Sequence, residues 1–498
     1  MPSHALDEKP DTLTQNSVIS ADDKSQVLFD NNEKTLTRTA SQASGNTLAS
    51  RRSRASRASQ APSHAPSDVE IAEALDAGVT EEHIDNGGDE LPNGGYGWVV
   101  VVCILALNAC TWGINTTYGV FTAFFLQHNY YGASQLQYAF VGGLSAAFAV
   151  LQGPLANYLT RLLGYKAVLL IGAVLCSLGQ CLSGLTHSFG AFIATQAIVF
   201  GLGMGLILVP SQPLVAHWFD RRLSLAQGIA QAGSGVGALI FSNTTPVLMY
   251  SVGVKYTYVI NGCISAFVLI TASLLLRGRH EQVQARQAPL QVSFFWHKGY
   301  KWLLLWAFLT MMGYFIAIYT LPSYCTSALG MTQKQGGAVQ SIVAAGQLVG
   351  RPMWGFFMDR LGRVNMVIVS YLICGAATLA IWMPGRTFGL MAFYGFVNGA
   401  CSGTIHSAAT PLTAAVVGIP ELASALSIYW LTLSIPNLMG QPFGIMLVDY
   451  SRTHLGRHGP GEYQIAIGFC AGLYLAAALA LFGVKHYLQG NWKLWQKS

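Results

Sequence analysis

The chain has 498 residues, of which 52% are hydrophobic and 10% are charged, and its formal net charge is +6. A soluble protein of this size would carry about 25% charged residues, so the composition excludes a soluble protein and indicates a membrane protein. We assign the positive charge to basic loops at the bilayer surface and expect no nucleic-acid partner.

The first segment, residues 1–92, is rich in Ser, Ala, Asp, Asn and Glu and contains few aromatic residues. Such a segment buries too little apolar surface to offset chain entropy, so we expect a disordered cytoplasmic tail. Within it, Arg51–Ser59 interleaves arginines with serines. We interpret this run as part of a solvated tail. The alternative is a segment that is controlled by phosphorylation or that binds anionic lipid.

Apolar runs of about 20 residues follow, each long enough to cross a hydrocarbon core about 30 Å thick. The predicted transmembrane helices cover residues 97–126, 136–160, 166–186, 190–213, 224–250, 256–276, 302–327, 335–358, 364–383, 387–413, 421–448 and 463–487. We therefore predict an all-α membrane protein with twelve transmembrane helices in two six-helix halves. The predicted halves are residues 93–277 and 302–488, joined by a cytoplasmic central loop at 278–301 and followed by a cytoplasmic tail at 489–498.

The loops between these helices differ in charge, and basic residues favour the cytoplasmic side. One alternating set of loops carries Arg161, Lys166, Arg221, Arg222, Arg277, Arg279, Arg286, Lys298, Lys301, Arg360 and Arg363. The other set carries only Lys255, Lys334, Arg386, Arg452 and Arg457. The first set and both termini are therefore predicted to be cytoplasmic. We expect the plasma membrane, with an internal membrane such as the vacuolar one as the alternative.

Two loops at corresponding places in the two halves are similar. Gly153–Lys166 and Gly355–Arg363 each place a small residue in a helix end, then a polar residue, basic residues and a glycine turn. This repeat resembles the major facilitator superfamily, whose two halves are related by an axis along the membrane normal.

Three further segments narrow the resemblance. They are the start of the first helix, Asn93-Gly94-Gly95-Tyr96-Gly97-Trp98-Val99-Val100, the segment His217–Gly237, and Arg351 in the eighth helix. Together, over residues 92–490, they are similar to the monocarboxylate porter family, particularly its fungal members with long serine-rich tails. Glycines in the second segment also predict close helix packing: Gly228, Gly233, Gly235 and Gly237.

The resemblance implies a secondary active or facilitative transporter that moves a small organic anion by alternating access, in symport with protons in some relatives. Two other transport functions stay open, namely movement of a larger vitamin-like solute and export of an acidic secondary metabolite. A membrane sensor that does not transport is a third alternative. Some relatives act with a single-span accessory membrane protein, and this sequence carries no sign of one.

Arg351 lies about 12 Å along its helix from the charged pair Asp359 and Arg360. A guanidinium at that depth costs about 2.5–3.5 kcal/mol, so it is expected to face a polar cavity and meet an anion. The alternative is a side chain that snorkels to the interface. The resemblance implies that Arg351 binds the substrate carboxylate. It also implies an acid one turn earlier and a lysine in the first helix, where this chain has Gln347 and Thr116, which leaves proton coupling by that route open.

The other candidate residues are polar side chains inside predicted helices. The predicted substrate-binding set is Arg351, Gln347, Asn115, Thr116, Tyr118, Tyr319 and Asn398. For each softer member the alternative is a hydrogen bond between packed helices. His406 is either a group that titrates near neutral pH or a packing histidine.

The predicted gating set lies at the cytoplasmic helix ends: Asp359, Arg360, Arg221, Arg222, Asn157 and Arg161. Ion pairs of Arg221 and Arg222 are expected to latch one conformation, and retention of topology accounts for these two residues equally well.

Enzyme chemistry is not expected. The nine cysteines lie in apolar stretches without a CxxC or Cys/His cluster, so neither disulfides nor a metal site is predicted. The sequence has no GxxxxGK[ST] pattern for ATP and no nucleophile–base constellation, so we predict no cofactor.

Overall fold

The computed structural model describes residues 93–279 and 292–489. The predicted N-terminal tail with its Arg51–Ser59 run, most of the central loop and most of the C-terminal tail lie outside these residues. All described residues belong to one compact unit, Gly87–Ser498.

The regular elements of the described part of the chain are helices. In the first half they are α3 (Tyr96–Asn108), α4 (Ile114–Gln127), α5 (Gln135–Leu151), α6 (Gly153–Leu163), α7 (Tyr165–Ser183), α8 (Phe189–Phe192), α9 (Phe200–Ser211) and α10 (Leu223–Leu275). In the second half they are α12 (Lys298–Ser323), α13 (Gln333–Leu361), α14 (Arg363–Ala377), α15 (Phe388–Ser402), α16 (Thr404–Val417), α17 (Leu422–Thr432), α18 (Ser434–Leu455) and α19 (Gln464–Gln489). Short π-helical turns join several of them without a break in the span, for example Ala109–Gly113 between α3 and α4.

Helical structure occupies each of the twelve predicted runs. Counted by length and apolar composition alone, eight helices of the described residues can cross a membrane, and the bent pair α5–α6 makes nine. Three of the twelve predicted runs are not counted separately in this way. They are the second arm of α10, which is counted together with the first arm, and the helices α13 and α15–α16. The two arms of α10, residues 223–252 and 254–275, meet at Gly253, whose φ of 84° turns the chain back. A φ of this sign favours glycine because it has no Cβ.

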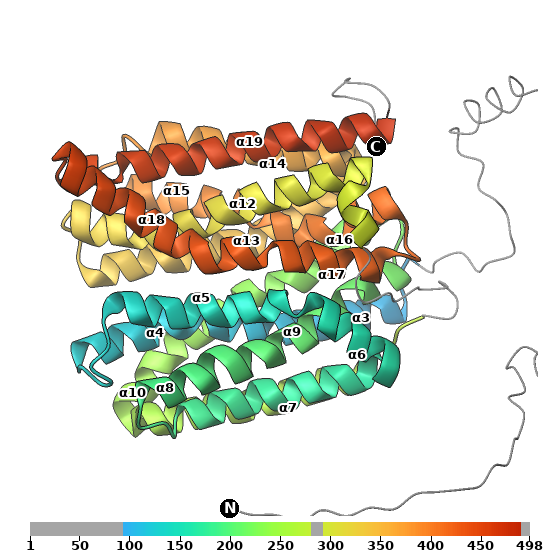
Figure 1. Ribbon diagram of the computed structural model, residues 1–498, viewed down its shortest axis with the longest axis horizontal. Helices are drawn as coiled ribbons and strands as arrows, with labels where there is room; N and C mark the ends of the chain where they lie inside the picture. Colours follow the sequence, from blue (N-terminus) through green and yellow to red (C-terminus); the bar gives the residue numbers. More distant parts are fainter. Residues whose placement is uncertain (1–92, 280–291, 490–498) are drawn as a thin grey trace, which may run out of the picture. The chain divides into compact units, whose positions relative to one another are not determined.

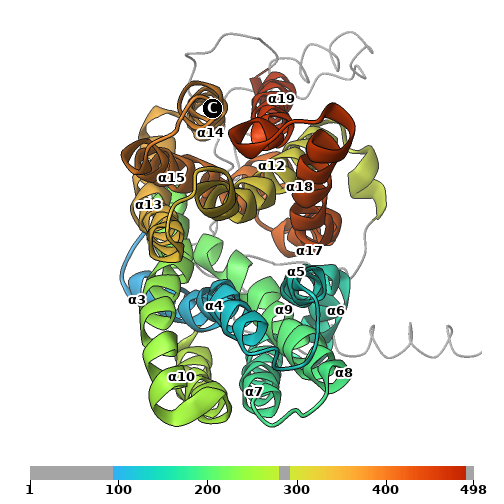
Figure 2. The same cartoon turned by 90° about the vertical axis from the view of Figure 1, so that its left-hand side faces the viewer.

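The helices form two bundles that lie side by side. Figure 1 shows α3–α10 in blue to green along one side and α12–α19 in yellow to red along the other, and Figure 2 shows the same two groups end-on. The first arm of α10 packs against α3 in its own bundle and against α13 in the other.

Glycines make that double packing close. A Cβ at Gly233 would meet the carbonyl of Leu105 on α3, and one at Gly228 would meet the carbonyl of Arg351 on α13. The prediction of close packing by the α10 glycines is therefore confirmed, and it brings Arg351 to the boundary between the bundles.

Candidate functional site

A small cavity of mostly apolar lining, with a few polar side chains, lies between the two bundles. Its volume is about 50 Å³, and residues of both bundles line it: Trp112, Asn115, Thr116, Leu208, Gln231, Ser234, Met311, Tyr314, Phe315, Ile318, Tyr319, Gln347, Arg351, His406 and Trp430. Tyr319 is 37% exposed, whereas Arg351 is 2% exposed. The cavity is thus reached from the Tyr319 side and has Arg351 at its inner end.

Arg351 points across the boundary between the bundles. Its Nη1 donates to the carbonyl of Gln231, at 2.5 Å, and to the hydroxyl of Ser234, both on α10. Its Nη2 donates to Oε1 of Gln347 on its own helix, at 3.2 Å, and its Nε has no hydrogen-bond partner. These partners are neutral, and the ion pairs found between described residues do not include Arg351. The side chain does not snorkel to a helix end, and a buried cation without a counter-charge leaves a strong site for an anion.

A row of polar and aromatic side chains continues from Arg351. Nε2 of Gln347 donates to the hydroxyl of Tyr314, at 3.1 Å. The ring of Tyr314 lies edge-on to that of His406, with centroids 5.7 Å apart, and Trp112 lies on another side of His406, at 6.5 Å. His406 therefore stands between a residue of the first bundle and a residue of the second, in the wall of the cavity.

Buried glutamines support the α10 side of the site. Oε1 of Gln212 accepts a hydrogen bond from Gln231, at 2.6 Å, and another from Gln227. Sequence reasoning missed Gln212, Gln231 and Ser234 as site residues. A usable signal was present, because Gln231 and Ser234 are three residues apart in an otherwise small and apolar stretch, and residues at that spacing share a helix face.

Five of the predicted substrate-binding residues line the cavity: Arg351, Gln347, Asn115, Thr116 and Tyr319. Asn115 accepts a hydrogen bond from the hydroxyl of Ser145, at 2.7 Å, which fixes its amide at the wall.

The structure does not bring Tyr118 and Asn398 to this cavity. Tyr118 is buried in an aromatic cluster of the first bundle and stacks on Phe192, with centroids 6.3 Å apart. Asn398 bonds to the hydroxyls of Tyr394, at 3.1 Å, and Tyr474, at 3.4 Å, inside the second bundle. Both are on helix faces that pack within their own bundle, so their geometry is that of helix-packing residues.

The predicted gate residue Asp359 joins the two bundles at the end of the molecule away from Tyr319. Its carboxylate accepts hydrogen bonds from the backbone N–H groups of Ser224, at 3.0 Å, and Leu225, at 2.8 Å. These groups belong to the first turn of α10, where an anion is stabilised by the unpaired N–H groups and the helix dipole. Arg363 adds a bond to the carbonyl of Asp220, at 2.8 Å. We call this region the Asp359 end.

The other predicted gate residues play different parts in the structure. Arg161, Arg221, Arg222 and Arg360 are exposed. The expected latching ion pairs of Arg221 and Arg222 do not occur among the described residues. The side-chain contact with the start of α10 comes from Asp359. The guanidinium of Arg360 lies 4.1 Å from the centre of the Phe356 ring. Asn157 is buried in α6, which packs against α17 of the second bundle.

Two helical bundles around a cavity that reaches a buried cation define a multi-pass membrane carrier. Residues 101–346 and 303–491 match the family described as Major Facilitator Superfamily, and the chain belongs to this superfamily. Its members are transporters, so the protein is a membrane transporter and not an enzyme. The predicted fold class and family resemblance are confirmed.

Relatives and solved structures agree with this assignment. The chain is 27% identical to the "Probable transporter MCH2" of Saccharomyces cerevisiae over 73% of this chain and 80% of that one. It is 27% identical to "Monocarboxylate transporter 10" of Danio rerio, covering 76% and 77%. It is 25% identical to the "Fujikurins efflux protein" of Gibberella fujikuroi, covering 72% and 78%.

Among solved structures, the proton:xylose symporter XylE aligns with a TM-score of 0.60 at 15% identity, over 78% of this chain and 95% of that one. FucP in the outward conformation aligns with a TM-score of 0.57 at 15% identity, covering 77% and 99%. At this identity the likeness concerns the fold alone.

Proposed function

We propose that the protein carries a small organic monoanion by alternating access and that Arg351 binds the carboxylate. The observation that carries this proposal is the guanidinium at the bundle boundary, 2% exposed and held by neutral partners. A guanidinium presents a planar fork of N–H groups that matches a carboxylate, and such pairs are strong where water is excluded.

The charge of the cavity supports a singly charged substrate. Among the residues that line it, Arg351 is the one with a permanent charge. While His406 is neutral, one carboxylate neutralises that charge, whereas a second would be buried unpaired at high cost.

The bonds of Arg351 give binding a route to conformational change. Its Nη1 ties α13 to Gln231 and Ser234 of the other bundle. A substrate carboxylate that accepts hydrogen bonds from the same guanidinium competes with these two hydrogen bonds. Substrate would then favour states in which the bundles separate near Arg351, as differential binding requires.

We further propose His406 as the proton site. The acid and lysine implied by the resemblance are replaced by Gln347 and Thr116. Histidine is the side chain type that ordinarily gains or loses a proton between pH 5 and 8, and His406 is the histidine that lines the cavity. The nearby Arg351 cation opposes a proton on His406 until an anion neutralises it. Its proton and an anion on Arg351 attract each other, so each would strengthen binding of the other by the same factor. Accumulation of substrate would then follow an inward proton gradient.

Uptake into proteoliposomes tests the anion site, with labelled short-chain monocarboxylates as probes. We expect Arg351→Ala to lower the ratio of maximal rate to KM by roughly 100-fold, the loss of two charge-assisted hydrogen bonds of about 1.5 kcal/mol each. Arg351→Lys keeps the positive charge but loses the planar pair of N–H groups, so its ratio of maximal rate to KM should lie between those of the unsubstituted protein and Arg351→Ala. Arg457→Ala, which removes an exposed arginine outside the cavity, is the matched control. Unchanged uptake by Arg351→Ala for every accepted anion would refute the assignment.

Efflux of an acidic metabolite is the second candidate, supported by the relative whose name is an efflux protein. The same cationic site would serve it. Transport measured separately in right-side-out and inside-out vesicles separates export from uptake, because the favoured direction reverses between the two preparations.

We also propose that the protein lies in the plasma membrane with the Asp359 end and both termini in the cytoplasm. The support is the bias of Lys and Arg toward the loops at that end. A C-terminal epitope on intact cells should stain only after permeabilisation, and staining of unpermeabilised cells would reverse the orientation.

A further inference from the structure

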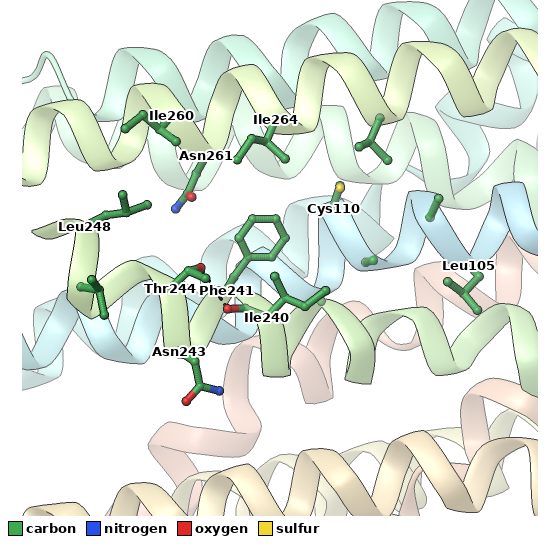
Figure 3. Close-up of a pocket in the computed structure, with 15 residues that line it drawn as sticks. Leu105, Cys110, Ile240, Phe241, Asn243, Thr244, Leu248, Ile260, Asn261 and Ile264 are labelled. Carbon is green, nitrogen blue, oxygen red and sulfur yellow. Dashed lines mark hydrogen bonds between the residues drawn. The ribbon is translucent and has the colours of Figure 1, made fainter.

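A second hollow of the protein opens on the outer side of the first bundle and is separate from the transport cavity. Its volume is about 750 Å³, and it lies between α3, the π-helical turn Ala109–Gly113 and the two arms of α10 (Figure 3). All its lining residues fall inside predicted transmembrane runs, so it faces the hydrocarbon of the bilayer. We call it the lateral groove.

The groove has apolar walls, and one unsatisfied polar group, the amide oxygen of Asn261, lies sealed just beneath them. Ile240, Val247 and Ile264 on its rim are 52%, 68% and 44% exposed. Asn261 projects between the two arms of α10, near Phe241 and Leu248 (Figure 3). It is 1% exposed, and its Oδ1 has no hydrogen-bond partner.

The other polar residues of the groove are satisfied by their own helix. Nδ2 of Asn243 donates to the carbonyl of Leu239, at 2.7 Å, and the hydroxyl of Thr244 donates to that of Ile240, at 2.9 Å. Nδ2 of Asn261 has a long bond of 3.4 Å to Thr245. The unpaired acceptor of Asn261 therefore stands out, since a buried polar group without a partner is costly in the hydrocarbon region.

We propose that the lateral groove binds a neutral lipid that carries one hydroxyl group on an apolar body, as a sterol does, with the buried amide of Asn261 turning into the groove to meet the hydroxyl. A hydroxyl both donates and accepts, so it satisfies either end of the amide, whichever of its two atoms faces the groove.

Depth and length favour this class of lipid over a phospholipid. Asn261 lies eight residues beyond the Gly253 turn, about 12 Å along the helix, where a charged head group is strongly disfavoured. The groove follows the first arm of α10 from Gly237 to Leu248, roughly 16 Å, or about half of the hydrocarbon core. A phospholipid chain fills the apolar part and brings no hydrogen-bond donor to Asn261.

The groove also adjoins the transport site through one short segment. Ala109 and Cys110 line the groove, and Trp112, two residues further on, lines the cavity. A lipid in the groove would rest on the outer face of the turn whose inner face carries Trp112. Occupancy of the groove is thus placed to influence the cavity wall.

The test uses the full chain in phosphatidylcholine nanodiscs with a photoactivatable sterol that keeps its free hydroxyl. We expect saturable labelling of peptides from the two arms of α10, with excess free sterol competing and the same sterol without its hydroxyl failing to compete. Asn261→Leu should raise the sterol concentration for half-maximal labelling roughly two- to tenfold, the effect of one hydrogen bond.

Two lipid-facing variants complete the design. Ile264→Trp fills the groove and should abolish labelling, whereas Leu274→Trp, at a position 57% exposed on the same arm and outside the groove, should leave it unchanged. Equal competition by the sterol without a hydroxyl, or displacement by phospholipid alone, would overturn the proposal. These arms decide the matter even if Asn261→Leu does not fold.

Discussion

Replacement of Asp359 tests whether the Asp359 end is held closed by capping of α10 across the bundle boundary. The side chain is 8% exposed and accepts two backbone N–H bonds from Ser224 and Leu225. Asp359→Ala removes both bonds and leaves the N–H groups of the first turn to water. Asp359→Asn keeps one acceptor oxygen and loses the charge.

The magnitude follows from these contacts. A hydrogen bond to a charged group contributes about 1.5–3 kcal/mol, so the lower value for two bonds gives about 3 kcal/mol. The pair with Arg363, at 4.0 Å and partly exposed, adds at most about 1 kcal/mol. Loss of 3 kcal/mol shifts the ratio of closed to open molecules by more than roughly 100-fold, and Asp359→Asn should give about half of that free energy.

Distances between spin labels measure this shift. Leu162→Cys on α6 and Leu361→Cys on α13 place labels at side chains that are 60% and 50% exposed, one on each bundle. Cys263 is exposed and would be replaced by serine first. We expect one short distance in the unsubstituted background, a dominant longer distance with Asp359→Ala and a mixture with Asp359→Asn. Arg360→Ala, next in sequence and exposed, is the control.

The reasoning would be refuted if Asp359→Ala gave the same distance distribution as the control. The closed end would then be held by the packing of α6 on α17 and of α10 on α13, and the carboxylate would be incidental to it.

Three further outcomes are expected. Gly233→Leu should prevent monodisperse elution of the protein in detergent, because its Cβ meets the Leu105 carbonyl, whereas Gly472→Leu, with open space around its Cβ, should elute normally. Asn398→Leu should leave the KM for substrate within about twofold and change the thermal stability, and a large rise in KM would move Asn398 back to the substrate site. His406→Gln should abolish accumulation driven by a pH gradient while exchange of labelled for unlabelled anion at equal pH persists, and loss of both would contradict a specific proton role.

Hydropathy located most of the helices, because in a bilayer each backbone polar group must be satisfied within its own helix and the side chains must be apolar. The run 335–358 was predicted as an apolar run, although α13 is rich in glycine and glutamine and is not among the helices that pass by length and apolar composition. The glycine turns also follow from local chemistry, as at Gly362, where φ is 104° between α13 and α14.

The partners of the polar residues could not be predicted in the same way. Asp359 was predicted as a gate residue, but its partners are backbone N–H groups 134 and 135 residues away, which side-chain identities do not reveal. The direction in which the Tyr118 side chain points depends on the π-helical turn at Ala109–Gly113. A wider turn changes which of the later residues share a helix face.

From the residues alone we predicted twelve membrane-spanning helices and recognised Arg351 as a costly buried charge, and the carrier function came from the family resemblance. The packing of the helices adds that this charge meets Gln231 and Ser234 of the opposite bundle, about 120 residues earlier in the chain, and that no carboxylate among the described residues neutralises it. This difference arises because burial free energy depends on residue type and segment length, which are local, whereas pairing depends on which helix faces meet. Those faces are set by the packing of α10 between α3 and α13.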